Sequence, residues 1–245
     1  MKKRRNEQSP LADEIRETIL ASEGYGISAE GERLSAIPFH QYMTLCLYHP
    51  DFGYYRSGAA ARVGREGDFY TSSNVGDIMG EQLAETLSRL ALERFGSGND
   101  IDVLDWGGGT GRLSRQMLDA WYPQARSVDP GPLPGTDSGE GPGTGGNVFR
   151  VAVIEGNPAH RAEAEAALGA YVRDGKARVV ADGEGLSPGD RPVIVVANEL
   201  LDAFPVHRLV MRNGKPKEWG VAWREDRGFV PCLLGEADPR LGGWL

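Results

Sequence analysis

The sequence predicts an α/β fold with a doubly wound, mainly parallel sheet, preceded by a helical N-terminal segment. Short apolar runs alternate along the chain with segments of helical periodicity, which is the pattern of parallel strands joined by helices. The run at residues 192–197 is continuously apolar, as in a strand buried on both faces. The run at 101–105 leads into a glycine-rich turn and then into a helical pattern.

That glycine-rich turn predicts a ligand pocket. Residues 101–111 read Ile-Asp-Val-Leu-Asp-Trp-Gly-Gly-Gly-Thr-Gly, with glycine at positions 107, 109 and 111. Glycine allows a sharp turn and a close approach of the backbone to a ligand. A strand, a glycine turn and the start of a helix form a nucleotide-type pocket at the carboxyl edge of a parallel sheet. We therefore expect Asp105, Gly107, Gly109 and Gly111 to bind a cofactor.

The spacing of the glycines favours one nucleotide cofactor over another. The dinucleotide fingerprint G-x-G-x-x-G would need its third glycine at position 112, where the chain has Arg112. This disfavours an NAD-dependent oxidoreductase. The observed pattern, acid-x-G-x-G-x-G from Asp105, is the form found in class I S-adenosylmethionine methyltransferases. A purely structural βα turn is the alternative for the motif taken alone.

The other elements are predicted from periodicity, capping residues and turns. The expected division is a helical N-terminal segment with a lid (residues 1–95) and a cofactor-binding α/β domain (residues 96–245) with a flexible insertion at 129–147. Within these we expect helices at 10–23, 38–47, 77–95, 112–122 and 158–172, strands at 101–105, 149–154, 177–181 and 192–197, and a hairpin joining 206–211 to 218–223 across Asn213-Gly214.

Polar residues follow each predicted strand where a ligand would lie. Glu155 follows the strand at 149–154, and an acid there hydrogen-bonds ribose hydroxyls in nucleotide-binding folds. Asp182 follows the third strand and could contact an adenine amino group, and Asn198 follows the fourth. Each also has a structural interpretation: a helix cap for Glu155 or Asn198, and a loop aspartate for Asp182.

Three further residues are the catalytic candidates. Glu199 and Asp202 come directly after the apolar strand at 192–197, and His207 lies close by. Carboxylates can orient a cationic acceptor through paired hydrogen bonds. A lone histidine is more often structural than a general base. A helix cap is the structural alternative for Glu199.

Composition limits the other functions. The formal net charge of −8 disfavours a nucleic-acid binder. No apolar run is long enough to span a membrane, and Lys2-Lys3-Arg4-Arg5 is not followed by the apolar region of a secretory signal. The two cysteines have no metal-type spacing. The expectation is a cytoplasmic protein without a metal, while the oligomeric state stays open.

With these residues identified, the chain resembles the MidA-like family of S-adenosylmethionine (SAM)-dependent methyltransferases. That family includes the mitochondrial complex I assembly factor, a protein arginine methyltransferase. The resemblance lies in Tyr-His-Pro-Asp-Phe-Gly-Tyr-Tyr at 48–55, Gly-Asp-Phe-Tyr-Thr-Ser at 67–72, the glycine turn at 105–113, and Ala-Asn-Glu-Leu-Leu-Asp-Ala-Phe-Pro-Val-His at 197–207.

The resemblance implies a class I, Rossmann-like fold, SAM as cofactor and a protein substrate methylated on arginine. The segment at 48–73 is rich in glycine and in aromatic residues, as a lid needs to be, so we expect it to fold over the cofactor. Gly67, Asp68, Thr71 and Ser72 of this segment belong to the expected cofactor site.

The chain also departs from the family pattern. It has Asp105 where the family has Glu, and Ser72-Ser73-Asn74 where the family has Ser-Pro-Glu. Family members run on past the position of Leu245, so the chain is expected to be C-terminally truncated. The alternative is therefore a non-catalytic SAM-binding or assembly module that keeps the methyltransferase fold.

Overall fold

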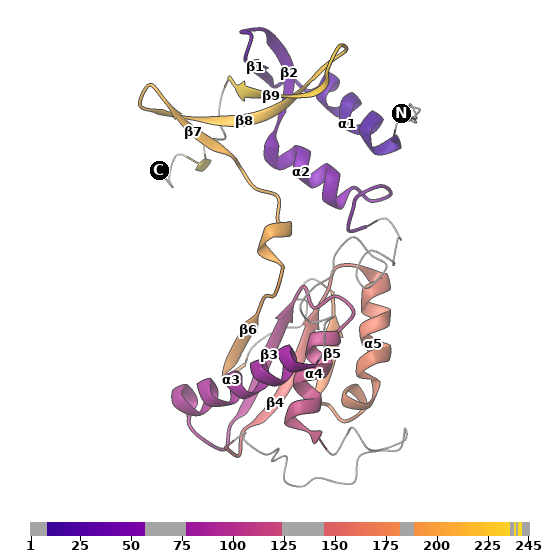
Figure 1. Ribbon diagram of the computed structural model, residues 1–245, viewed down its shortest axis with the longest axis vertical. Coiled ribbons are helices and arrows are strands. Elements are labelled where there is room, and N and C mark those ends of the chain that lie inside the picture. The colour runs from indigo at the N-terminus through magenta and orange to yellow at the C-terminus, as the bar shows by residue number, and fades with distance from the viewer. Residues whose placement is uncertain are drawn as a thin grey trace. The chain divides into compact units, whose positions relative to one another are not determined.

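The computed structural model divides the chain into two compact units, which are described separately. Unit 1 comprises Met1–Ser57 and Ala203–Leu245, and unit 2 comprises Gly58–Asp202. The structure describes residues 9–56, 77–123, 145–181, 189–235, 238 and 240–241. Figure 1 shows the elements of both units.

Unit 2 contains the predicted parallel sheet. Its strands are β3 (Asp100–Trp106), β4 (Val148–Ile154), β5 (Ala177–Val180) and β6 (Val193–Val196), in the spatial order β5-β4-β3-β6. All three pairings are parallel. From β3 the chain moves outward through β4 and β5 and then returns to the other side of β3. The carboxyl ends of β3 and β6 therefore mark a topological switch point, where α/β sheets bind ligands.

Three helices pack against one face of this sheet (Figure 1). They are α3 (Ile78–Phe95), α4 (Arg112–Trp121) and α5 (Pro158–Arg173). Alternate strand residues face them because successive side chains of a strand point to opposite faces. The strands contribute Ile101, Val103, Phe149, Val151, Val153, Ala177, Ile194 and Val196 to this core, which confirms the predicted α/β class.

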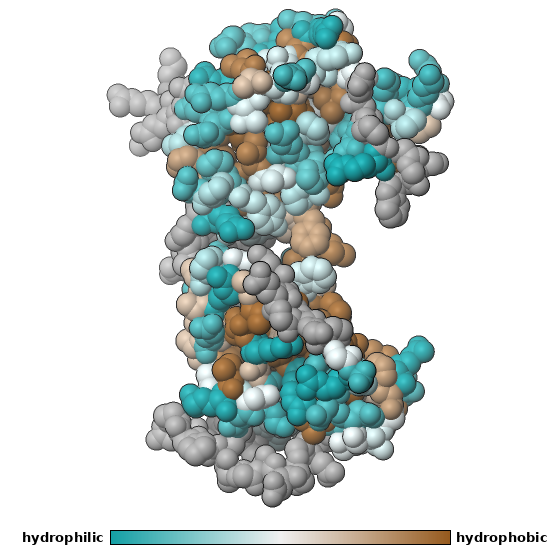
Figure 2. Space-filling view, turned by 180° about the vertical axis from the view of Figure 1, so that it is seen from behind, coloured by the Kyte–Doolittle hydropathy of each residue, from teal (hydrophilic) through white to brown (hydrophobic). Residues whose placement is uncertain are grey.

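The strand residues out of phase with that core include exposed apolar side chains. Trp106 of β3 and Val195 of β6 are exposed by 48% and 54%. Val195 is the register partner of Leu104, two residues before Trp106, so these residues share the face opposite the helices. Figure 2 shows a face of the molecule where hydrophobic residues reach the surface.

Trp121 joins two helices and a strand in the core of unit 2. Its ring stacks on Phe149 with centroids 4.3 Å apart and planes 7° apart. Its indole Nε1 donates to the Ala84 carbonyl at 3.1 Å and to Ser88 Oγ at 3.0 Å on α3. The buried polar atom of the indole is therefore satisfied, and α3, α4 and β4 are held together by one side chain.

Unit 1 is built on an antiparallel sheet. Its strands are β1 (Tyr25–Ile27), β2 (Arg33–Pro38), β7 (Leu209–Arg212), β8 (Lys215–Arg224) and β9 (Gly228–Leu234), in the order β2-β1-β9-β8-β7. A further β2–β8 pairing closes β1, β2, β8 and β9 into a ring. The predicted hairpin across Asn213-Gly214 is confirmed, with both turn residues at positive φ (52° and 72°) as a type I′ turn requires.

Two helices cover this sheet. They are α1 (Pro10–Ala21) and α2 (Phe39–Tyr48). Ile15 and Ile19 of α1 are buried with Ile37 of β2 and Val221 of β8. The predicted helices in this region are confirmed, and two strands that were not predicted, β1 and β2, lie between them in the sequence. Strands β1 and β2 are short, and their partners β8 and β9 lie near the other end of the chain.

The expected division of the chain at residue 95 also differs from the observed one. Helix α3 packs in unit 2, and residues from 203 onward pack in unit 1. The reason is that strands distant in the sequence pair with one another: β8 pairs with β2, and β9 pairs with β1.

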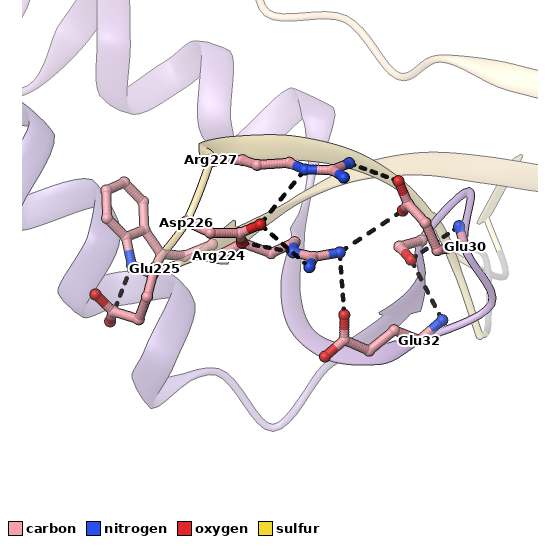
Figure 3. A network of polar contacts seen from close by, with 8 residues as sticks. Glu30, Glu32, Arg224, Glu225, Asp226 and Arg227 are labelled. Carbon is pink, nitrogen blue, oxygen red and sulfur yellow. Dashed lines mark hydrogen bonds and ion pairs between the residues drawn. The ribbon is translucent and has the colours of Figure 1, made fainter.

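Ion pairs link two turns of unit 1 (Figure 3). Arg224 Nη1 lies 3.2 Å from Glu32 Oε2, and Arg227 Nη1 lies 2.6 Å from Glu30 Oε1. The two acids lie in the turn between β1 and β2, and the two arginines flank the turn between β8 and β9. Exposed pairs of this kind contribute little to stability. Their effect is to hold the two turns side by side.

Replacing Trp121 tests the packing of unit 2. Trp121→Ala is expected to lower the free energy of unfolding by about 3–5 kcal/mol, because it leaves a cavity and removes the contacts to α3. The measurement is urea unfolding followed by circular dichroism. Ile78→Ala, at a 74% exposed position of α3, is the control and should change stability by no more than about 0.5 kcal/mol. Equal effects would contradict this account of the core.

Candidate functional site

The glycine turn after β3 has the backbone shape that its sequence predicts. Gly107, Gly109 and Gly111 all adopt positive φ values, of 75°, 57° and 73°. Gly111 N donates to the Gly108 carbonyl at 2.9 Å, and Gly111 is the N-cap of α4. Side chains with a Cβ rarely adopt these φ values. The three predicted positions therefore form one tight turn at the carboxyl edge of the sheet.

Close packing fixes the position of this turn. A Cβ added to Gly111 would lie 3.0 Å from the Cβ of Ala164 on α5. A Cβ added to Gly107 would lie 2.7 Å from Cδ1 of Leu200, in the loop after β6. The turn therefore lies against the loop after β6, at the switch point.

Glu155, directly after β4, joins the turn through its carboxylate. Its Oε2 accepts from Gly109 N at 3.0 Å, and its Oε1 accepts from Asn157 N at 2.7 Å. Asn157 is the N-cap of α5, and its Oδ1 accepts from Ala159 N. The acid expected to bind ribose hydroxyls is thus half-buried beside the glycine turn. Each carboxylate oxygen has two lone pairs, so both keep acceptor capacity.

Asp105 takes a structural place in this arrangement. Its side chain is buried, at 2% exposure, and its Oδ2 accepts from the Ser114 hydroxyl at 2.6 Å. Burial raises the pKa of Asp105 from 3.8 to about 6, against the lowering effect of the Ser114 hydrogen bond. Its oxygens therefore hold the start of α4 under the turn. The role of Asp105 as a cofactor ligand stays a prediction.

The loop after β6 presents the predicted polar cluster. Glu199 and Asp202 are exposed, and Asn198 is half-buried. Glu199 has a φ of 52°, in the left-handed region that disfavours non-glycine residues. Such strain typically costs about 1–3 kcal/mol and clusters at ligand sites. The loop therefore holds an exposed carboxylate at the switch point in an unfavourable backbone conformation.

His207, the third catalytic candidate, lies in unit 1 and is therefore not grouped with Glu199 and Asp202. Its Nδ1 lies 2.7 Å from Oε1 of Glu218 on β8. Sequence reasoning missed Glu218. The available signal was an acid in phase with Gly220 and Ala222, at the inward positions of a predicted strand.

Five predicted cofactor residues lie outside the described residues. They are Gly67, Asp68, Thr71, Ser72 and Asp182, and they remain predictions, as do the lid over residues 57–73 and nearly all of the insertion at 129–147.

Comparison with known proteins identifies the chemistry of related chains. Residues 142–241 match a family model described as "Putative S-adenosyl-L-methionine-dependent methyltransferase". A solved structure from Burkholderia thailandensis, a "likely methyl transferase" bound to S-adenosyl-homocysteine, superimposes with a TM-score of 0.64. It is 28% identical and covers 95% of this chain and 52% of its own. A second structure from the same organism, an uncharacterised protein, gives a TM-score of 0.60 at 25% identity, covering 95% and 49%.

A curated relative is similar over a shorter stretch. It is a mitochondrial protein arginine methyltransferase NDUFAF7 homolog from Drosophila melanogaster, 25% identical over 204 residues, which are 74% of this chain and 40% of that protein. The chain therefore spans about half the length of the solved structures and less of the curated relative. No helix among the described residues is long and apolar enough to cross a membrane.

The buried carboxyl of Asp105 predicts a pH dependence of stability. Because its pKa is raised on folding, the stability that protonation contributes is complete below pH 3.8 and is lost as the pH rises through about 6. The shift from 3.8 to about 6 corresponds to roughly 3 kcal/mol. Asp105→Asn, which can still accept from Ser114, should become more stable relative to wild type by up to about this amount from pH 4 to pH 7. Urea unfolding at several pH values measures this difference.

If the difference in the free energy of unfolding between the two proteins stayed constant over that pH range, the raised pKa of the buried Asp105 would be contradicted. Asp119→Asn is a control from the neighbouring helix, at a carboxylate with 15% side-chain exposure that accepts from Tyr171 and pairs with Arg115.

Proposed function

We propose that this chain, which belongs to the MidA-like family of S-adenosylmethionine-dependent methyltransferases, transfers a methyl group to a protein substrate, with an arginine guanidinium as the acceptor. Its cofactor is SAM. The observation that carries the proposal is the hydrogen bond between Glu155 and Gly109 N at the switch point of the parallel sheet.

The described residues fit this cofactor. Gly107, Gly109 and Gly111 carry no Cβ that could block close approach, and packing against Ala164 and Leu200 holds the turn in place. Glu155 would accept hydrogen bonds from the ribose hydroxyls, while Asn198 offers both a donor and an acceptor after β6. The bound cofactor supplies a methyl group already activated by a positively charged sulfur. The chain's own task is then to position the acceptor and exclude water.

Glu199 and Asp202 are proposed to hold the acceptor. A guanidinium stays protonated at neutral pH because its pKa is above about 12. Paired hydrogen bonds that its N–H groups donate to carboxylates orient such a group, and the carboxylates balance its charge. Both carboxylates are exposed and lie within one short loop after β6. The positive φ of Glu199 supports a functional role, because the backbone conformation is unfavourable for a glutamate.

Binding of S-adenosyl-homocysteine tests the cofactor site. Glu155→Ala is expected to weaken binding at least tenfold, because the ribose hydroxyls lose a charged acceptor and the turn loses its support at Gly109; tenfold corresponds to about 1.4 kcal/mol. The measurement is isothermal titration calorimetry. Glu165→Ala, at an exposed position of α5 in the same unit, should bind like wild type. Equal affinity of all three proteins would place the cofactor elsewhere.

Methyl transfer to arginine-containing peptides tests the acceptor site. Glu199→Gln and Asp202→Asn should each lower transfer at least about tenfold with nearly unchanged S-adenosyl-homocysteine affinity, because each removes a charge that orients the guanidinium. Glu199→Gly separates this role from folding: it relieves the positive φ, so it should lose activity without losing stability. The assay follows radiolabelled methyl incorporation, with Glu165→Gln as control. Cofactor binding without transfer by the wild type would favour a non-catalytic module.

A further inference from the structure

The loop between β4 and α5 carries the carboxylate of the candidate cofactor site, and a side chain of α5 folds back onto it. That side chain is Arg161, which lies in the first turn of α5 and is half-buried. Its Nη1 donates to the backbone carbonyls of Glu155 and Gly156, both at 2.9 Å. One nitrogen therefore holds two consecutive peptide groups of the loop, and the cofactor contacts proposed for this site make no use of it.

A guanidinium is well suited to hold two neighbouring carbonyls. Each terminal nitrogen carries two hydrogens, so Nη1 can give one to each oxygen. Hydrogen bonds from an ionised donor are stronger than those between neutral groups. Neither carbonyl accepts another hydrogen bond from the part of the chain that the structure describes. Without Arg161, both oxygens would lose the partner that fixes their direction.

Other hydrogen bonds fix the two ends of the same loop. Glu155 N donates to the Val180 carbonyl of β5 at 3.0 Å. Asn157 Oδ1 caps α5 by accepting from Ala159 N at 2.9 Å. The Glu155 carboxylate bridges Asn157 N and Gly109 N of the glycine turn. The two carbonyls that the guanidinium holds lie between these fixed points, so a rotation of either peptide group would move the carboxylate relative to the glycine turn.

We propose that Arg161 is a positioning residue, which presets the Glu155 carboxylate for the ribose hydroxyls of the cofactor by holding these two carbonyls. The inference rests on the proposed function and lies within unit 2. Arg161 acts through Glu155 and has no contact of its own with the ribose in this assignment. A loop that is ordered before the cofactor arrives lowers the ordering cost of binding. Loss of the guanidinium therefore weakens binding without removing the carboxylate itself.

Binding of S-adenosyl-homocysteine to the full chain tests this role by a double-mutant cycle. Arg161→Met keeps the apolar stem and removes the donors, so it should weaken binding about fivefold in isothermal titration calorimetry. Arg161→Lys should restore part of the affinity, because an ammonium can still donate to the carbonyls. Combined with Glu155→Ala, Arg161→Met should change the affinity by less than about twofold, because the carboxylate that it positions is gone.

Arg115→Met is the matched control. Arg115, on α4 of the same unit, also donates to a backbone carbonyl of α5, that of Ala167 at 3.1 Å. That carbonyl lies beyond the first turn of the helix, away from the loop after β4. The control variant should therefore bind S-adenosyl-homocysteine like wild type, although it also loses an arginine that donates to α5.

Two further readouts distinguish positioning from a merely structural role. Without cofactor, amide hydrogen exchange at Gly109 should become at least about threefold faster in Arg161→Met, because its acceptor is held less firmly. Exchange at Val151 of β4, whose N–H donates to the Lys176 carbonyl, should stay the same. In the transfer assay, the KM for SAM should rise about fivefold with kcat nearly unchanged, because the ribose contact is equal in the ground and transition states.

Three outcomes overturn the proposal. One is wild-type affinity for S-adenosyl-homocysteine in Arg161→Met. Another is an equal loss of affinity whether or not the Glu155 carboxylate is present, since Arg161 would then act independently of it. The third is unchanged exchange at Gly109. Failure of the proposed function looks different: a wild type that binds no S-adenosyl-homocysteine overturns both proposals, while one that binds it but transfers no methyl group overturns the proposed reaction and leaves the binding cycle and the exchange rates to decide the role of Arg161.

Discussion

The hydrogen bond from the Gly109 backbone to the Glu155 carboxylate is the contact on which the candidate cofactor site depends. It joins the loops that leave two neighbouring parallel strands, and it uses a backbone donor that only an open, left-handed turn presents. Because the same carboxylate also receives the N–H of Asn157, it anchors the start of α5. One side chain therefore sets the distance between the turn and the helix. A ligand meets an edge that is already assembled, which lowers the ordering cost of binding.

Two features of this edge reduce stability and are placed where chemistry would need them. Asp105 carries a carboxyl whose ionisation is opposed by burial, yet its hydrogen bond to Ser114 secures the helix under the turn. Glu199 occupies a backbone conformation suited to glycine. Each feature lowers the stability of unit 2 locally, and the packing of its core offsets this loss. Departures of this kind from local preference are typical of functional sites.

Unit 1 differs from unit 2 in how its sheet is assembled. Its sheet is made from segments near both ends of the described chain, and the β2–β8 pairing closes four strands into a ring. A polar side chain that is buried in this unit needs hydrogen-bond partners. Both carboxylate oxygens of the buried Glu218 have partners, and these belong to residues 207 and 238.

The sequence by itself determined much of unit 2. Its strands, its helices and the turn at Gly107, Gly109 and Gly111 follow from local periodicity and from the conformational freedom of glycine, which act over a few residues. The place of Glu155 at the end of a strand followed in the same way. Only the tertiary structure decided that Asp105 is buried under the turn, that Glu199 is strained, and that Glu218 supports His207. It also decided that β1 and β2 exist. These strands of three and six residues pair with each other and also with β9 and β8, and such long-range partners leave no periodic signal in the local sequence.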